Sequence, residues 1–115
     1  MAEFDWSILD QLTEEVGAEI LPRLLGTFYG EAMTRIGEFE KLSAAGTDKA
    51  EMHRAVHSLK SAAGSFGASA LANLAAEIEQ KIEDGVWVHD PAAIAEMGAR
   101  FQTFKAAVAA RGIAV

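Results

Sequence analysis

The sequence has no cysteine, only two prolines, and no apolar run longer than a few residues. The lack of cysteine excludes disulfides, thiol catalysis and zinc sites built on cysteine, and fits a reducing compartment, so we expect a cytoplasmic protein. A membrane-spanning helix needs about 20 consecutive apolar residues, so no such helix is expected. The acidic residues Glu3 and Asp5 stand where a secretion signal would have a basic region followed by an apolar one, so we expect no secretion signal.

Positive charge is also scarce, and it is scattered along the chain. Ten Lys and Arg residues stand against 17 Asp and Glu residues, which gives a formal net charge of −7. Binding to nucleic acid or to an anionic membrane needs a basic stripe, and the sequence shows none. We therefore expect neither partner, and we expect a monomer that docks other proteins through a local patch.

Apolar residues recur at helical spacing from one end of the chain to the other, which predicts an all-α fold. A short helix should follow the N-cap Asp5, and four longer helices should span about 18–22 to 42, 48 to 66, 69 to 84 and 90 to 108. The helix over 48 to 66 should begin at Asp48, with Glu51 three residues on as in a capping box, and should end at Gly67. Ser69 and Asp90 are the expected N-caps of the last two helices. Short connections make neighbouring helices antiparallel, so we predict one domain over residues 1–115. Its architecture should be an antiparallel up-down four-helix bundle with a short additional N-terminal helix.

The third predicted helix separates an apolar stripe from a ridge of polar and small residues. At about 100° per residue, one direction is shared by the apolar residues Met52, Val56, Leu59, Ala63 and Phe66. About 120° away lie the ridge residues His53, His57, Lys60, Ser61 and Gly64. Glycine inside a helix costs about 1 kcal/mol relative to alanine, so Gly64 calls for an explanation. Close approach by a partner protein and close approach by the neighbouring helix are the two candidates.

The run from His57 to Leu71 closely resembles the signature of histidine-containing phosphotransfer domains. That signature places lysine at +3 from the histidine, glycine usually at +4 and at +7, often glycine at +10, and leucine near +14. The matching residues are His57, Lys60, Gly64, Gly67 and Leu71. Ser61 departs from the usual glycine at +4 but is still small. An acidic residue or glutamine near +22 is common in the family, and here that residue is Glu79.

The resemblance implies a phosphocarrier rather than an enzyme, with His57 exchanging a phosphoryl group with aspartates in receiver domains of response regulators or of a hybrid kinase. It implies that Lys60 meets the phosphoryl oxygens. Glu79 would accept the ring N–H if the third and fourth helices pack antiparallel; an ordinary surface carboxylate at this position, or Glu77 in its place, stays open. The docking surface would comprise His53, Ser61 and Gly64.

No ATP site is recognisable in so short a chain, and no cofactor is expected. Mg²⁺ would belong to the partner receiver domain alone. Which ring nitrogen of His57 carries the phosphoryl group stays open, with Nε2 as our expectation.

Two alternatives compete with this interpretation. His53 and His57 stand at i and i+4, a spacing that can chelate a metal ion, but the metalloprotease pattern needs glutamate after the first histidine and position 54 is arginine. No third ligand is indicated and Lys60 is adjacent, so we expect no metal site. The second alternative is a helical adaptor whose histidine is incidental, which only a phosphoryl-transfer assay separates from a carrier.

Overall fold

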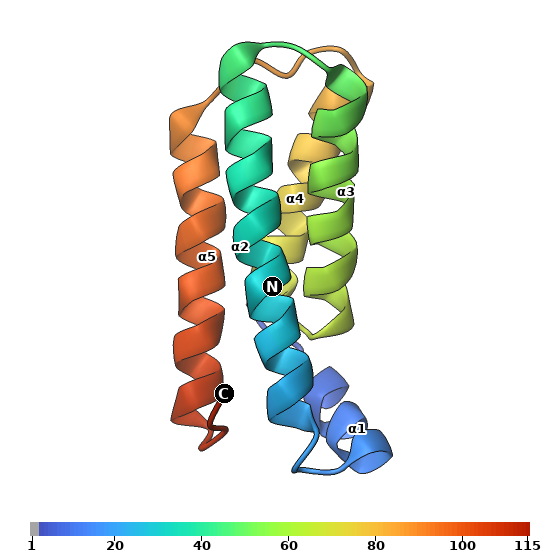
Figure 1. Ribbon diagram of the computed structural model, residues 1–115, viewed down its shortest axis with the longest axis vertical. Coiled ribbons are helices and arrows are strands. Elements are labelled where there is room, and N and C mark those ends of the chain that lie inside the picture. The colour runs from blue at the N-terminus through green and yellow to red at the C-terminus, as the bar shows by residue number, and fades with distance from the viewer. Residues whose placement is uncertain (1–2) are drawn as a thin grey trace.

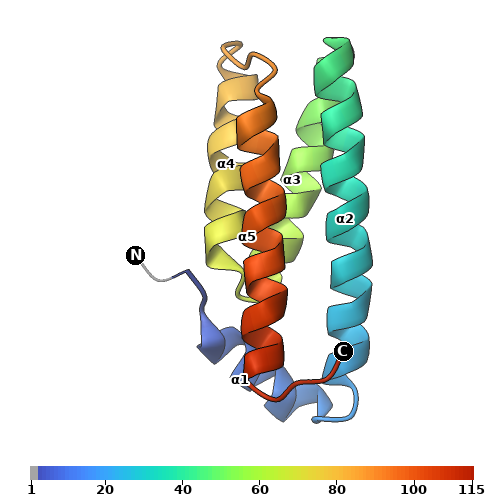
Figure 2. The same cartoon turned by 90° about the vertical axis from the view of Figure 1, so that its left-hand side faces the viewer.

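Residues 3–115 are described by a computed structural model, and within that range they form five helices and no strand. The helices are α1 (Trp6–Val16), α2 (Leu21–Ala45), α3 (Lys49–Ser65), α4 (Ser69–Glu83) and α5 (Pro91–Ala110). The four long helices alternate in direction in a bundle of 42 × 26 × 21 Å, and α1 crosses its lower end (Figures 1 and 2). The prediction of an all-α antiparallel four-helix bundle with a short N-terminal helix is confirmed. None of the helices described is both long enough and apolar enough to cross a membrane.

One core runs along the bundle, and the apolar stripe of α3 faces it. Met52, Val56, Leu59 and Ala63 are buried, as their spacing predicts. Phe66 lies just beyond the last residue of α3, is half-buried, and stacks on another phenylalanine of the core. The most extensive contacts of α3 are with α4, followed by α2. Side chains on the flank of α3 that faces α4 are therefore held between two well-packed helices.

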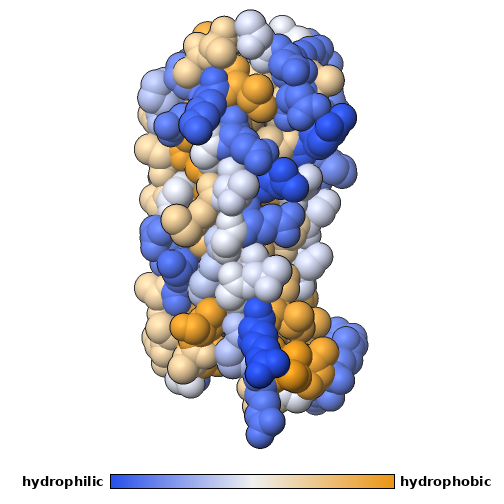
Figure 3. Space-filling view, in the orientation of Figure 1, coloured by the Kyte–Doolittle hydropathy of each residue, from blue (hydrophilic) through white to orange (hydrophobic). Residues whose placement is uncertain are grey.

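Most hydrophilic side chains on the face in Figure 3 cover the upper part of the bundle. Apolar side chains gather at the lower end of that face, where α1 packs against the long helices (Figure 3). The exposed part of the α2–α3 half is thus mainly polar near the connections between the long helices.

The two ends of α3 are set by residues that the sequence singled out. At its start, the backbone N–H of Glu51 donates to Asp48 Oδ1 over 3.1 Å, which is the predicted N-cap. At its end, the N–H of Gly67 bonds to the carbonyl of Gly64 and the N–H of Ala68 to that of Ala63. This is a Schellman ending, with Gly67 at the left-handed position and a φ of +79°. The length of α3, and so the position of every residue on its ridge, follows from these local signals.

The predicted N-cap of α4 is wrong. Ser69 is the first helical residue, and Ala68 occupies the cap position without a side-chain hydrogen bond. The N–H of Ala70 instead donates to the carbonyl of Glu3 over 2.9 Å. A backbone carbonyl more than sixty residues away in the chain thus satisfies one of the N–H groups that have no partner within the first turn of α4.

A polar cluster around the buried Ser43, which the sequence did not reveal, anchors the α4–α5 connection. Ser43, only 3% exposed near the end of α2, accepts a hydrogen bond from Trp87 Nε1 over 3.0 Å. Its hydroxyl oxygen also lies 2.7 Å from His89 Nδ1. The connection between α4 and α5 is therefore held against α2 at the upper end of the bundle.

The two glycines of the run after His57 should respond in opposite ways to replacement by alanine. A Cβ added at Gly67 would lie 2.4 Å from the carbonyl oxygen of Asp5, in a backbone conformation that alanine disfavours. We expect Gly67→Ala to lower the free energy of unfolding by more than about 1 kcal/mol. A Cβ added at Gly64 would meet nothing within 4 Å. Gly64→Ala should therefore leave stability unchanged or raise it by up to about 1 kcal/mol. Urea denaturation of both variants tests this, and equal losses would contradict it.

Candidate functional site

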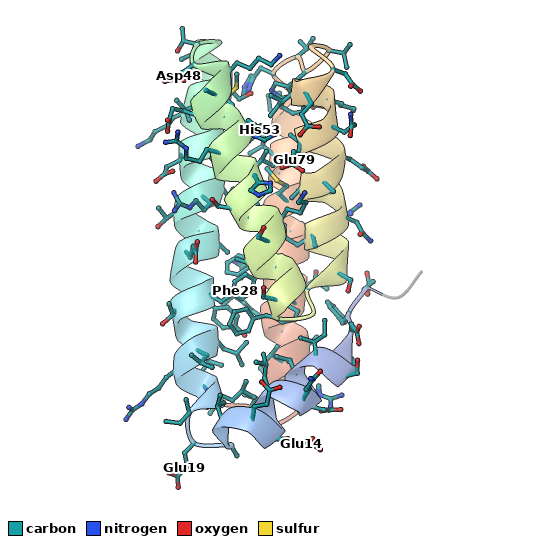
Figure 4. The ribbon with its side chains drawn as sticks, turned by 90° about the vertical axis from the view of Figure 1, so that its right-hand side faces the viewer. Glu14, Glu19, Phe28, Asp48, His53 and Glu79 are labelled. Carbon is teal, nitrogen blue, oxygen red and sulfur yellow. The ribbon has the colours of Figure 1, made fainter. Side chains whose placement is uncertain are left out.

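The candidate site lies at the seam between α3 and α4, in the part of the bundle nearer the α2–α3 connection. Figure 4 shows His53 and Glu79 labelled at this seam, one from each helix. The side chain of His57, one turn along α3 from His53, is 54% exposed. Glu79 projects from α4 and is only 7% exposed. An accessible imidazole and a buried carboxylate thus meet at one point.

His57 and Glu79 are hydrogen-bonded to each other, through Nδ1 of the ring and Oε2 of the carboxylate. The structure brings these two residues together as the antiparallel packing of α3 and α4 requires. Glu77, the competing candidate, is exposed and lines a separate hollow between α4 and α5, together with Glu96 and Arg100. Of the two glutamates, Glu79 is therefore the one that can orient the His57 ring.

Lys60 contacts the same carboxylate from the other side. Its Nζ donates to Glu79 Oε1 over 2.5 Å, so each oxygen of Glu79 has a partner on α3. The sequence suggested only that Lys60 would meet phosphoryl oxygens, and the Lys60–Glu79 ion pair was not foreseen. The lysine side chain is one-third exposed, so its ammonium group stands between the buried carboxylate and solvent.

The charge of Glu79 follows from these contacts. Burial by itself raises the pKa of the Glu79 carboxyl, but hydrogen bonds from Lys60 and His57 and the charges of both groups hold that pKa below its usual value. Glu79 is therefore a carboxylate near neutral pH, which can only accept hydrogen bonds. The proton shared with His57 consequently belongs to Nδ1, so the neutral form of the ring has its lone pair on Nε2.

The small residues of the ridge lie on open surface next to His57. Ser61 and Gly64 are both exposed. Since a Cβ at Gly64 would touch no neighbouring helix, packing within the bundle does not explain this glycine. Of the two candidate explanations, the close approach of a neighbouring helix is therefore excluded.

His53 is partly buried and lies beside two glutamates of α4. Its Nε2 lies 2.9 Å from Glu83 Oε1 and 3.7 Å from Glu79 Oε2. Its ring is nearly parallel to that of His57, with centroids 5.9 Å apart. The sequence did not single out Glu83. The signal that could have found it is the matching i, i+4 spacing of His53 and His57 on α3 and of Glu79 and Glu83 on α4.

A shallow groove adjoins His57 on the side toward the start of α3. It is lined by Lys49, Ala50, His53, Arg54, His57, Ile82 and Glu83. The imidazole therefore has open surface on both sides along the helix, with the groove on one side and the small residues Ser61 and Gly64 on the other.

The chain is similar in sequence to known proteins. Phosphorelay protein LuxU of Vibrio vulnificus (strain YJ016) is 39% identical over 75 residues, which cover 64% of this chain and 64% of LuxU. LuxU of Vibrio harveyi is 35% identical over 74 residues, covering 64% of this chain and 63% of its own. The chain therefore matches just under two thirds of the length of these curated relatives.

A solved structure extends the likeness to the whole bundle. The crystal structure of histidine-containing phosphotransfer protein B (HptB) from Pseudomonas aeruginosa PAO1 superposes with a TM-score of 0.80 at 28% identity, over 88% of this chain and 86% of HptB. Residues 23–110 match the family described as the Hpt domain. With three quarters of its residues in that match, the chain belongs to the Hpt domain family.

Proposed function

We propose that this protein carries a phosphoryl group on His57 between receiver-domain aspartates in a two-component phosphorelay. The observation that carries the proposal is an exposed imidazole whose Nδ1 is held by a buried carboxylate. Membership of the Hpt domain family supports it, as does similarity to proteins that are themselves phosphorelay proteins. Residues 1–115 would act as one domain, a cytoplasmic monomer with neither nucleic acid nor membrane among its partners.

In the proposed transfer, Nε2 of neutral His57 attacks the phosphorus of an aspartyl phosphate in the receiver domain. An N–P bond forms as the P–O bond breaks, and the aspartate leaves as a carboxylate. The ring keeps its Nδ1 proton and gains positive charge. Glu79, already bonded to that proton, stabilises the charge as it develops. The same steps in reverse return the phosphoryl group to another receiver aspartate.

Lys60 is the residue of this site best placed to respond to the phosphoryl group. It is one turn along α3 from His57, partly exposed, and already paired with Glu79. Two unit charges about 4 Å apart attract by about 1 kcal/mol in water and by about 4 kcal/mol at an effective dielectric constant of 20. Lys60 would therefore tune the lifetime of the phosphorylated state, while His57 alone forms the covalent bond.

The partner would supply what this chain lacks. The receiver domain would bring the acidic pocket and its Mg²⁺, so we propose that the carrier itself needs no cofactor and has no ATP-dependent kinase activity. His53, Ser61 and Gly64 flank His57 on α3 and would form the surface on which the receiver docks. The small size of Ser61 and Gly64 would let the receiver surface approach the ring closely.

The dependence of stability on pH tests the state of Glu79. Because folding lowers the pKa of this carboxyl, its contribution to stability is present above the unfolded value of about 4.3 and is lost as pH falls through the folded value. We expect the free energy of unfolding to fall more steeply between about pH 5 and pH 3 in wild type than in Glu79→Gln. Denaturant titrations across this range measure it, with Glu77→Gln as the matched control that should follow wild type. Equal steepness in all three proteins would show that the Glu79 carboxylate does not contribute.

Replacing the histidines one at a time tests the carrier residue. His57→Gln should fold normally and accept no label from a phosphorylated receiver domain, because the nucleophile is gone. His53→Gln should still accept label, since it removes no reacting atom. The label on wild type should be lost in acid and kept in alkali, as a phosphoramidate is. Label that persists in His57→Gln, or that is stable in acid, would refute the proposal.

The same transfer assay tests the docking surface. Ser61→Gln should slow transfer with little loss of stability, because a longer side chain beside His57 holds the receiver away from the ring. Thr103→Gln, an equally exposed site on α5, is the matched control and should transfer at the wild-type rate. Equal rates in the two variants would move the docking surface off this ridge.

A further inference from the structure

Three groups of the kind that ligate metals converge beside His57, and only one of them, Glu79, takes part in the proposed transfer step. They are His53, Glu79 and Glu83, and their ligand atoms lie within 4.8 Å of one another. His53 Nε2 is 2.9 Å from Glu83 Oε1 and 3.7 Å from Glu79 Oε2. A tetrahedral ion with bonds of about 2.0–2.1 Å holds its ligand atoms about 3.3 Å apart. The observed spacings lie on either side of this value, so small side-chain movements suffice to close the set around one ion.

The helices hold these ligands in place from both sides of the seam. Glu79 and Glu83 are one turn apart on α4. His53 faces them from α3, the helix with which α4 makes its most extensive contacts. Glu79 is buried, whereas the side chains of His53 and Glu83 are 36% and 48% exposed and line the groove. An ion could therefore enter from solvent, take three protein ligands, and keep a water molecule in its fourth position.

The carboxylate oxygens of Glu79 and Glu83 that face His53 are not paired with Lys or Arg, so they can bind a cation. Lys60 pairs with Oε1 of Glu79, whereas Oε2 faces both imidazoles, and Glu83 has a histidine as its partner. Imidazole and carboxylate together favour Zn²⁺ and related d-block ions, while Mg²⁺ prefers oxygen ligands. The sequence argument against a metal site relied on the absence of a third ligand, and the structure supplies two glutamates. The positive charge of Lys60 repels a metal ion bound nearby, so the affinity of the site for the ion should be moderate.

We propose that His53, Glu79 and Glu83 form a binding site for a divalent d-block cation, with Zn²⁺ as the probe, and that its occupation restrains phosphoryl transfer. The restraint rests on the proposed function, whereas the binding does not. Glu79 Oε2 is at once the acceptor for His57 Nδ1 and a ligand of the site. An ion that draws the negative charge of this carboxylate toward itself weakens the support that Glu79 gives to the ring.

Isothermal titration calorimetry of the full chain with Zn²⁺, in chelator-free buffer, tests the site. We expect one Zn²⁺ per chain, binding weakened by at least about tenfold in Glu83→Gln, and no saturable binding of Mg²⁺ at the same concentrations. Glu77→Gln, on the outer side of the same helix, is the matched control and should bind as wild type does. In NMR spectra, Zn²⁺ should shift the His53 ring signals of wild type but not those of Glu83→Gln. Undetectable binding, or equal binding by wild type and Glu83→Gln, would overturn the site.

Transfer from a phosphorylated receiver domain tests the restraint separately. Saturating Zn²⁺ should slow acceptance several-fold in wild type and in Glu77→Gln, and should leave Glu83→Gln unaffected. Equal slowing in all three proteins would place the metal effect on the receiver and overturn the restraint. A wild-type chain that binds Zn²⁺ but accepts no label even without metal would refute the proposed function and leave the binding site standing.

Discussion

The shared carboxylate of Glu79 is the interaction on which the account of this site depends. A buried carboxylate without partners is driven toward its neutral form, because the charged form loses its hydration. Here each oxygen has a partner from α3, and the charge is retained. This requires α3 and α4 to pack in one register, since a shift of a single residue along either helix would turn Glu79 away from His57. The packing of the bundle and the chemistry of the imidazole are therefore set by the same contact.

The glycines of the family signature serve different physical ends in this chain. Gly67 provides a left-handed backbone at the end of α3, and its lack of a side chain leaves room for the carbonyl of Asp5. The segment that leads into α1 is hydrogen-bonded there, through the N–H of Asp5 and the carbonyl of Gly67. Gly64 has no such constraint, and its surroundings are open. The spacing pattern of the signature thus combines one glycine that the fold requires with one that the fold does not require.

Sequence reasoning succeeded where the physical cause was local. The apolar stripe of α3, the cap at Asp48 and the helix end at Gly67 each depend on residues within one or two turns. It failed at Ser69, which is the first helical residue of α4 rather than its cap, and the next N–H, that of Ala70, bonds to the distant carbonyl of Glu3. The pairing of Lys60 with Glu79, the approach of Glu83 to His53 and the burial of Ser43 all depend on the register between helices. Periodicity within one helix does not specify that register, which is why Glu77 and Glu79 stayed in competition until the structure separated them.

We propose that Glu79 holds the proton on Nδ1 of His57 and so leaves Nε2 as the reacting atom. The nitrogen that carries the phosphoryl group is the most direct test of this claim. Long-range ¹H–¹⁵N correlation spectra of the phosphorylated, ¹⁵N-labelled protein identify it from the coupling of each ring nitrogen to phosphorus. We expect an N–P bond at Nε2 with the proton still on Nδ1. A phosphoryl group on Nδ1 would contradict it, because that nitrogen could not then donate to Glu79.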